Sequence, residues 1–262
     1  MNVKNLRSNA PFLSPSGHPL RIVVLDSPYD TIQSQQTQNF FGRLAAFKIR
    51  SYQKEYPDGV LPVDTVDFVA THLLLCEQIG DEIQPLMGMK SITHRRCLRH
   101  NLQFPALHLV ESQELKAHHD AIEEYLRKAA LAGETVAYNG SWTIDPGLRV
   151  HREFVRLCWD VTVAFFVFHY SENHIQSLAG ATLRFKIHDF KEFMGFSYLG
   201  SPAGQLSSFE CQPFFGEKVA LMVLNGCSPQ AVEVAERYRF LWQNRLVIGK
   251  DTTKESEELM VA

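Results

Sequence analysis

The stretch from His151 to Tyr170 constrains the fold more than any other part of the chain. It has the length of a long helix, and its second half is apolar on nearly all sides, including the run from Val163 to Phe168. A helix of this kind has to be buried by other elements. Because the apolar run is far shorter than the roughly 20 residues that cross a bilayer, we expect a core helix and no membrane span.

Length and composition indicate an ordinary globular protein. The 262 residues allow one large domain or two small ones, and 45% hydrophobic with 21% charged residues excludes disorder as the main state. The formal charge of −3 carries no nucleic-acid signature and favours a small-molecule ligand. With no repeat and no interior linker, we expect one domain over residues 20–249, a flexible arm at 1–19 and a flexible tail at 250–262.

The cysteines exclude two further classes. Five are present, an odd number, and no two form a CxxC pair, so neither a disulfide framework nor a thiolate zinc site is expected. The N-terminal residues contain no apolar segment typical of a secretory signal. We therefore predict a cytoplasmic protein.

Apolar periodicity predicts strands and helices in the first half of the chain. Asp120 and Glu123 have the spacing of a capping box at a helix start. The alternating basic and apolar residues at 94–109 are expected to form a loop and a short strand. The other expected elements are a strand at 20–25, a helix at 31–56 closed by Pro57-Asp58-Gly59, strands at 66–75 and 83–92 paired as a hairpin, and a helix from 120 to 133.

In the second half, strands alternate with helices. Gly195 is the expected stop of one helix, and Ser228 with Pro229 opens another. The expected elements are a strand at 135–144, a turn at 145–147, the helix at 151–170, a strand at 174–179, a helix at 186–194, strands at 196–199 and 219–224, and a C-terminal helix. This alternation is typical of an α/β protein.

Two local patterns support a family resemblance. Lys191-Glu-Phe-Met-Gly195-Phe196 looks like a helix ending in Y-x-x-x-G-F, and the segment from Trp142 to Arg149 looks like a V-x-P-x-x-R turn. With the order of elements, they resemble the GNAT superfamily of acyltransferases. The resemblance implies a three-layer α/β/α sandwich with a central, mostly antiparallel mixed sheet.

The N-terminal half is similar to one branch of that superfamily. Arg43-x-x-x-Phe47 followed by Asp64-x-x-Asp67 resembles the R-x-x-x-F and D-x-x-D signature of acyl-homoserine-lactone (autoinducer) synthases and long-chain N-acyl amino acid synthases. The match covers about residues 40–200 and leaves 219–249 as a strand-helix extension. It implies transfer of an acyl group from acyl carrier protein or acyl-CoA to an amino-acid-like amine, with no permanently bound cofactor.

The sequence also departs from the family pattern. Tyr138-Asn-Gly-Ser141 stands where autoinducer synthases have Glu-x-x-Arg, and the segment Arg149–Phe154 lacks both glycines of the usual phosphate loop. The tyrosine that often serves as general acid is replaced, its place falling at Lys191 or Phe190. These departures motivate an alternative, a GNAT-like module that binds a ligand or partner without catalysis.

The resemblance assigns roles to several residues. Asp64 and Asp67 would hold the amine-bearing substrate, and Arg43 would line the cleft while Phe47 packs below it. Near the turn, three residues would contact the phosphopantetheine of the donor: Arg149, Arg152 and Trp142. The two arginines lie where a helix begins, which suits a phosphate, although solvated surface arginines are an equal alternative.

An arginine cluster is the strongest local charge anomaly. Arg95, Arg96 and Arg99 could dock an acidic acyl carrier protein or hold an acceptor carboxylate. The alternative is a solvated strand edge. His94, Cys97 and His100 are of metal-ligand type but have no fourth partner, so no metal is expected; a metal hydrolase would need a histidine cluster elsewhere.

Overall fold

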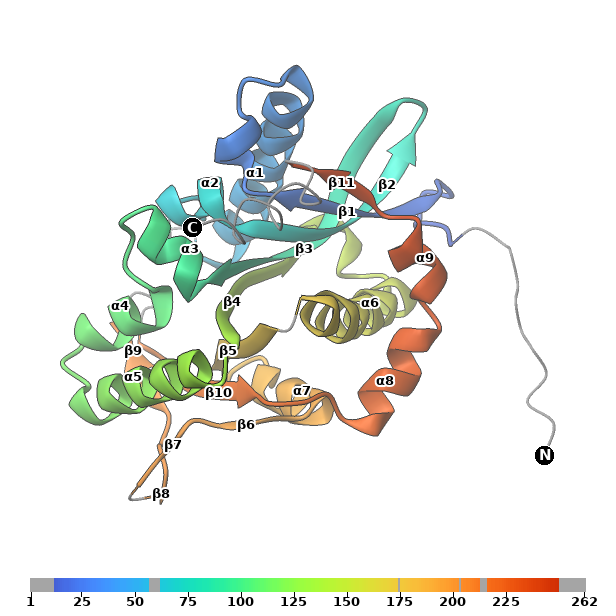
Figure 1. The fold of residues 1–262 in the computed structure, drawn as a ribbon. Helices are drawn as coiled ribbons and strands as arrows, with labels where there is room; N and C mark the ends of the chain where they lie inside the picture. The colour runs from blue at the N-terminus through green and yellow to red at the C-terminus, as the bar shows by residue number, and fades with distance from the viewer. Residues whose placement is uncertain (1–11, 57–61, 174, 203, 213–215, 250–262) are drawn as a thin grey trace.

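The computed structural model describes residues 12–56, 62–173, 175–202, 204–212 and 216–249. Its centre is a nine-stranded mixed sheet in the order β11-β1-β2-β3-β4-β5-β10-β6, with β9 added beside β10 (Figure 1). Among the described strands, only β1 with β11 and β4 with β5 are parallel pairs. The strands are β1 (Leu20–Asp26), β2 (Thr71–Ile79), β3 (Glu82–Thr93), β4 (Thr135–Ile144), β5 (Ile175–Thr182), β6 (Phe196–Tyr198), β9 (Phe209–Cys211), β10 (Glu217–Leu224) and β11 (Leu246–Ile248), with β7 (Gly200–Ser201) and β8 (Gly204–Gln205) forming a separate ribbon.

Helices cover both faces of this sheet, which confirms the predicted α/β sandwich. Figure 1 shows α6, α8 and α9 on one side and α4 and α5 on the other. The helices are α1 (Gln35–Glu55), α2 (Thr65–Val69), α3 (His94–Arg99), α4 (Pro105–Glu111), α5 (Lys116–Leu131), α6 (Arg152–Glu172), α7 (Ile187–Met194), α8 (Pro229–Glu236) and α9 (Arg239–Gln243), with short 3₁₀ turns η1 (Pro28–Thr31) and η2 (Pro146–Leu148).

The two-residue period of the strands separates the core into layers. In β1, Ile22 and Val24 pack in the cluster that contains α6, whereas Val23 and Leu25 pack against α1. Within α6, the residues from Val161 to Phe168 are all buried, as the sequence predicted. The helix beside the sheet is therefore the centre of one hydrophobic layer.

Several predicted elements are wrong, and local capping explains why. Residues 65–69 are α2 rather than the start of a strand, because the Asp64 and Asp67 side chains form a reciprocal capping box. Residues 94–109 form α3 and most of α4: the Thr93 hydroxyl caps α3, accepting from the Arg96 N–H at 3.1 Å, and Pro105 stands in the first turn of α4, where proline is favourable.

The expected helix starts also need correction. α5 begins at Lys116, so Asp120 is not a cap but an interior residue that pairs with Lys116 Nζ at 3.1 Å. The single C-terminal helix is two, α8 and α9, although the Ser228 cap is confirmed by its bond from Ala231 N–H. Segment 219–249 supplies most of β10, which lies between β5 and β6.

The chain ends are described only in part. Of the predicted arm, residues 12–19 form a turn in which Phe12 packs on Tyr238, with ring centroids 5.4 Å apart. Residues 1–11, the predicted tail and the Pro57-Asp58-Gly59 helix stop lie outside the described residues. None of the helices in the described part is both long and apolar enough for a membrane crossing.

Candidate active site

The parallel strands β4 and β5 pair along only part of their length. Their register runs from Thr135 opposite Ile175 to Asn139 opposite Ala179, and beyond this point the two strands no longer pair with each other, although β4 continues beside β3 and β5 beside β10. The Tyr138 hydroxyl hydrogen-bonds the backbone of Gly180 at this point. A Cβ on Gly180 would lie 3.0 Å from that hydroxyl, so the absence of a side chain at Gly180 gives the Tyr138 hydroxyl its space beside the strands.

A β-bulge in β4 lies directly beyond the last paired residue. Gly88 of β3 is opposite Thr143, but Lys90 is opposite Gly140, so β4 carries one extra residue. Ser141 adopts a left-handed backbone with φ of 55°, as bulges often require. Bulged residues leave part of their backbone outside the ladder, so this segment has polar groups available for a ligand.

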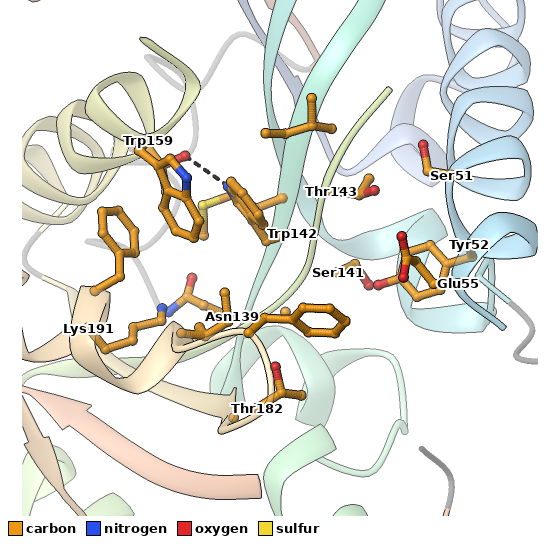
Figure 2. Close-up of a pocket in the computed structure, with 18 of the residues that line it drawn as sticks. Ser51, Tyr52, Glu55, Asn139, Ser141, Trp142, Thr143, Trp159, Thr182 and Lys191 are labelled. Carbon is orange, nitrogen blue, oxygen red and sulfur yellow. Dashed lines mark hydrogen bonds between the residues drawn. The ribbon is translucent and has the colours of Figure 1, made fainter. Parts of the chain in front are cut away.

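A cavity of about 470 Å³ opens where the two strands separate. This volume is in the usual range of small-molecule sites. Figure 2 shows Ser51, Tyr52 and Glu55 of α1 on one side, Trp159 and Lys191 on the other, and β4 between them. The lining residues are Ser51, Tyr52, Glu55, Tyr56, Met89, Asn139, Gly140, Ser141, Trp142, Thr143, Ile144, Arg149, Val155, Trp159, Thr162, Phe166, Gly180, Thr182, Phe185, Ile187, Phe190 and Lys191.

One wall of the cavity is aromatic. Trp142 stacks on Trp159 with ring centroids 4.2 Å apart, and Trp159 meets the Phe190 ring edge-on at 4.2 Å. The Trp142 Nε1 donates to Thr162 Oγ1 at 2.9 Å, which fixes the orientation of the indole. This wall is apolar and suits a hydrocarbon chain or a ring.

The opposite wall is polar and comes from the last turns of α1. The Tyr52 hydroxyl is hydrogen-bonded to the Ser141 side chain, and burial raises the pKa of Tyr52. Glu55 forms an ion pair with Arg149, whose Nε also donates to the Ile144 carbonyl at 3.1 Å. The buried Ser51 hydroxyl has no hydrogen-bond partner in the described part of the chain.

Lys191 is the most unusual residue of the lining. The residue is 7% exposed, and Nζ lies 4.3 Å from the Phe166 ring centroid and 4.4 Å from that of Phe196. Burial lowers the pKa of Lys191 to about 7. No carboxylate, carbonyl or hydroxyl of the described residues pairs with it.

The predicted donor-site residues are only partly together. Trp142 and Arg149 line the cavity, and Arg149 is engaged by Glu55. Arg152 is exposed at the first position of α6 and is not part of the lining. The cavity therefore unites two of the three residues that the turn pattern indicated.

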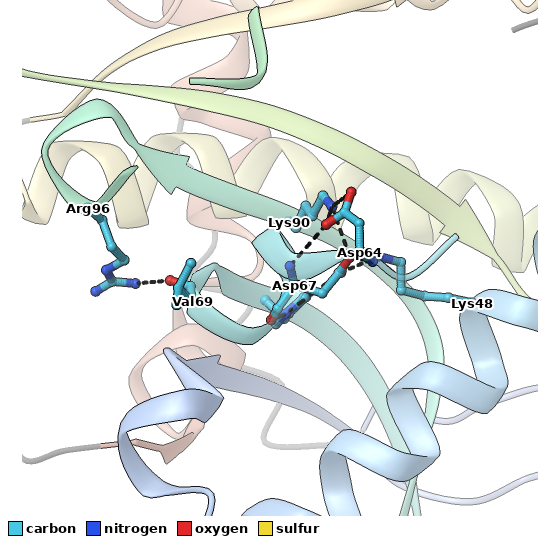
Figure 3. A network of polar contacts seen from close by, with 7 residues as sticks. Lys48, Asp64, Asp67, Val69, Lys90 and Arg96 are labelled. Atoms are coloured by element: carbon cyan, nitrogen blue, oxygen red, sulfur yellow. Dashed lines mark hydrogen bonds and ion pairs between the residues drawn. The ribbon is translucent and has the colours of Figure 1, made fainter. Parts of the chain in front are cut away.

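The predicted acidic pair lies in a separate buried network, shown in Figure 3. Asp67 is 1% exposed and binds Lys48 Nζ and Lys90 Nζ, the latter at 2.9 Å. Lys90 also bonds both carboxylate oxygens of Asp64 at 3.1 Å, and the Asp64 side chain is 52% exposed. Because the Lys48 and Lys90 ammonium groups lie beside it, the pKa of Asp67 is lowered despite burial.

The other residues of the predicted amine site lie along α1. Arg43 pairs with Glu82 at 3.3 Å and donates to the Ile83 carbonyl at 3.1 Å, whereas Phe47 is buried between α1 and the sheet. Neither residue lines the large cavity. Phe47 does border a small hollow that also touches Ser141 and Thr143, so the two regions are neighbours.

The arginine cluster lies on α3 rather than on a strand edge. Arg96 binds Asp26 at 2.8 Å and the Val69 carbonyl at 3.2 Å (Figure 3), whereas Arg95 and Arg99 are exposed. Arg96 thus joins α3 to β1 and the end of α2. The described residues contain no group of three histidine, cysteine or acidic side chains that could hold a metal.

Sequence reasoning named Lys191 as one of two positions for the missing tyrosine, but it missed the burial of Lys191 beside a cavity and the role of α1. Lys191 did carry a signal: with Ile187, Phe190 and Met194 it completes the i, i+3, i+4, i+7 stripe of α7. A lysine at such a position is directed toward the core. Tyr52 and Glu55 carried no comparable signal, because only the fold brings the end of α1 beside β4.

In comparisons with known proteins, no family model and no curated sequence matches the chain. Solved structures do match. FeeM, an N-acyl amino acid synthase from uncultured soil microbes, is 12% identical over 88% of this chain and 100% of its own, with a TM-score of 0.46. BjaI, a CoA-dependent acyl-homoserine lactone synthase solved with SAM and isopentyl-CoA, is 14% identical over 87% and 92%, with a TM-score of 0.47.

A third match is the acyl-homoserine lactone synthase LasI, 14% identical over 89% of this chain and 100% of that one, with a TM-score of 0.43. The three proteins are of the two kinds that the sequence patterns resemble. The likeness is distant and concerns the arrangement of helices and strands.

Proposed function

We propose that the protein is an N-acyltransferase that moves an acyl group from acyl-CoA or an acyl carrier protein to an amino-acid-like amine. The observation that carries the proposal is the cavity at the separation of β4 and β5. It combines an aromatic wall, a polar wall and a bulged stretch of strand backbone. A thioester needs these three surroundings for its chain, its acceptor and its carbonyl.

The bulge at Ser141 supports a position for the thioester carbonyl. Attack by an amine puts negative charge on the carbonyl oxygen, and preorganised N–H donors lower the barrier most when they point at that oxygen. The bulged backbone is the part of the cavity wall where such donors are free of the β-ladder. We expect the carbonyl to lie beside Ser141 and Trp142.

The N-terminus of α6 is the expected binding position of the donor phosphates. Val155 and Trp159, in its first two turns, line the cavity, so the helix N-terminus lies at its edge. Free N–H groups there favour an anion, and Arg152 is exposed beside them. Arg149 would contribute once its pairing with Glu55 opens.

The remaining assignments from the resemblance stay predictions. Asp64 keeps an exposed carboxylate for an ammonium group, whereas Asp67 would first have to give up a lysine. Arg95 and Arg99 present charge on α3 for an acidic carrier protein. The cytoplasmic location is also a prediction from the sequence.

The alternative, a binding module without catalysis, makes a different prediction about the cavity. A module that binds only a protein partner could have its cleft filled by side chains, whereas this one is open. The open cavity favours the enzyme. Ligand binding without turnover would nevertheless support the alternative.

The proposal is tested by incubating the protein with acyl-CoA or acyl carrier protein and a panel of amino acids. We expect thiol release together with an acylated amine, both measured by mass spectrometry. Thr182→Trp places an indole in the cavity and should abolish both signals, whereas Arg127→Ala on the exposed face of α5 should leave them unchanged. Failure of every donor and acceptor pair would contradict the proposal.

A further inference from the structure

The buried lysines of this protein fall into two groups. Lys48 and Lys90 lie among carboxylates, as buried ammonium groups nearly always do. Lys191 is equally buried, yet its nearest partners in the described part of the chain are the Phe166 and Phe196 rings. Two aromatic ring faces stabilise an ammonium group much less than a carboxylate does.

A structural role does not account for a lysine at this position. The neighbours Ile187, Phe190 and Met194 complete an apolar stripe, so leucine or methionine would fill the site of Lys191 without the cost of burying a charge. The amine instead borders a cavity that opens to a ligand. We therefore expect the amine to act on a ligand bound in that cavity.

We propose that Lys191 is a catalytic residue that accepts a proton from the ammonium group of the acceptor and delivers it to the departing thiolate. This inference rests on the proposed acyl transfer. The acceptor enters as an ammonium ion, which cannot attack a carbonyl until it loses a proton. Neutral Lys191 is a base inside the cavity and needs no rearrangement of an ion pair to act.

The proton balance of the step is closed. Lys191 takes one proton, the free amine attacks the thioester carbon, and a C–N bond forms. The nitrogen then gives a second proton to water as the C–S bond breaks, and Lys191 returns its proton to the thiolate. The products are an amide, a thiol and one proton in solution, with Lys191 neutral again.

The surroundings of Lys191 allow both the neutral and the protonated amine near pH 7. Burial alone lowers its pKa to about 7, and no charged group contributes to that shift. Cavity charges are on the far wall, where Glu55 and Arg149 neutralise each other. The titratable groups beside it on α7 are His188, Asp189 and Glu192. The elements around it add others, including Asp160, His169 and Tyr170 of α6, Tyr198 of β6, Glu233 of α8 and Glu217 and Lys218 of β10.

The test compares Lys191→Met, which removes the base, and Lys191→Arg, which keeps a charge that cannot be lost, with Lys128→Met on the exposed face of α5. Both Lys191 variants should lower kcat by about 10²-fold or more, and Lys128→Met should leave it unchanged. Wild-type activity should rise as the pH increases through about 7, and the Lys191 variants should lack this rise. Full activity of Lys191→Met with an unchanged pH profile would overturn the inference but not the proposed function.

A second measurement does not depend on turnover. NMR titration of protein labelled with ¹³C-lysine, with the Lys191 signal assigned by its loss in Lys191→Met, should show a midpoint near pH 7. A midpoint above pH 10, or an acyl group found on Lys191 by mass spectrometry during turnover, would overturn the role as a proton carrier. Absence of acyl transfer by the wild-type protein would overturn the proposed function and this inference with it.

Discussion

Asp67→Asn is the substitution that separates structural from catalytic roles in the buried charge network. The side chain keeps its size but loses its negative charge. Asp67 accepts hydrogen bonds from Lys48, from Lys90 at 2.9 Å and from the Asp64 N–H at 3.0 Å, and it is 1% exposed. An asparagine amide group would face two ammonium groups with one acceptor oxygen.

The expected loss of stability depends on which ion pairs the two lysines retain in Asp67→Asn. Lys90 retains Asp64, whose carboxylate is half exposed, but Asp67 is the only carboxylate that pairs with Lys48 among the described residues. Removing one partner of a buried ion pair costs about 3–5 kcal/mol in unfolding free energy. For a chain of this size that corresponds to a Tm lower by about 6–20 °C.

The assay is urea or thermal unfolding at pH 7, with Asp64→Asn as the matched control. Asparagine caps a helix as well as aspartate does, and the Asp64 pair with Lys90 is partly solvated, so we expect that variant to lose about 1 kcal/mol or less. A stability of Asp67→Asn within 1 kcal/mol of wild type would refute this reasoning. If stability were kept but acyl transfer lost, the substrate-binding role predicted for Asp67 would be supported instead.

Three further predictions concern stability and thiol chemistry. Gly195→Ala should lower the free energy of unfolding by about 1–3 kcal/mol, because the backbone of Gly195 has a φ of 105° and the new Cβ would lie 2.6 Å from the Gly226 carbonyl oxygen. Gly42→Ala in α1, the control, should be neutral or stabilising, because nothing lies within 4 Å of the new Cβ. Burial lowers the pKa of His72 to about 4, below its unfolded value of about 6.5, so stability should fall by about 3 kcal/mol as the pH drops from 6.5 to 4, and His72→Gln should lack this part of the fall. With a thiol reagent, the native protein should expose at most the half-buried Cys227, and all five cysteines should react after denaturation.

The longer elements could be predicted from the sequence because each contains a local run or stripe of apolar residues that the fold buries. This holds for β1, β4, α6 and α7. The short helices α2, α3 and α4 were missed, because each is only five to seven residues long and is marked by a local cap or proline rather than by a long apolar stripe. Asp64 illustrates the difficulty. It caps α2 and pairs with Lys90, but in the sequence alone the Asp64-x-x-Asp67 pattern resembles a substrate-binding motif.

The candidate site was predictable where its residues are local. Trp142 and Arg149 belong to one strand-turn-helix segment and were found together. Tyr52 and Glu55 are about 90 residues earlier in the chain and reach the cavity only because α1 packs beside β4. Lys191 could have been recognised from its place in the apolar stripe of α7, a signal that needs no tertiary contact.

The measurement that tests the central claim most directly is a crystal structure with an acyl-CoA analogue in which a thioether replaces the thioester. We predict that the sulfur lies between β4 and β5 beside Ser141, with the acyl chain against Trp159 and the Lys191 amine facing the linkage. Binding of the analogue elsewhere on the protein, with the cavity between these strands left empty, would contradict the account.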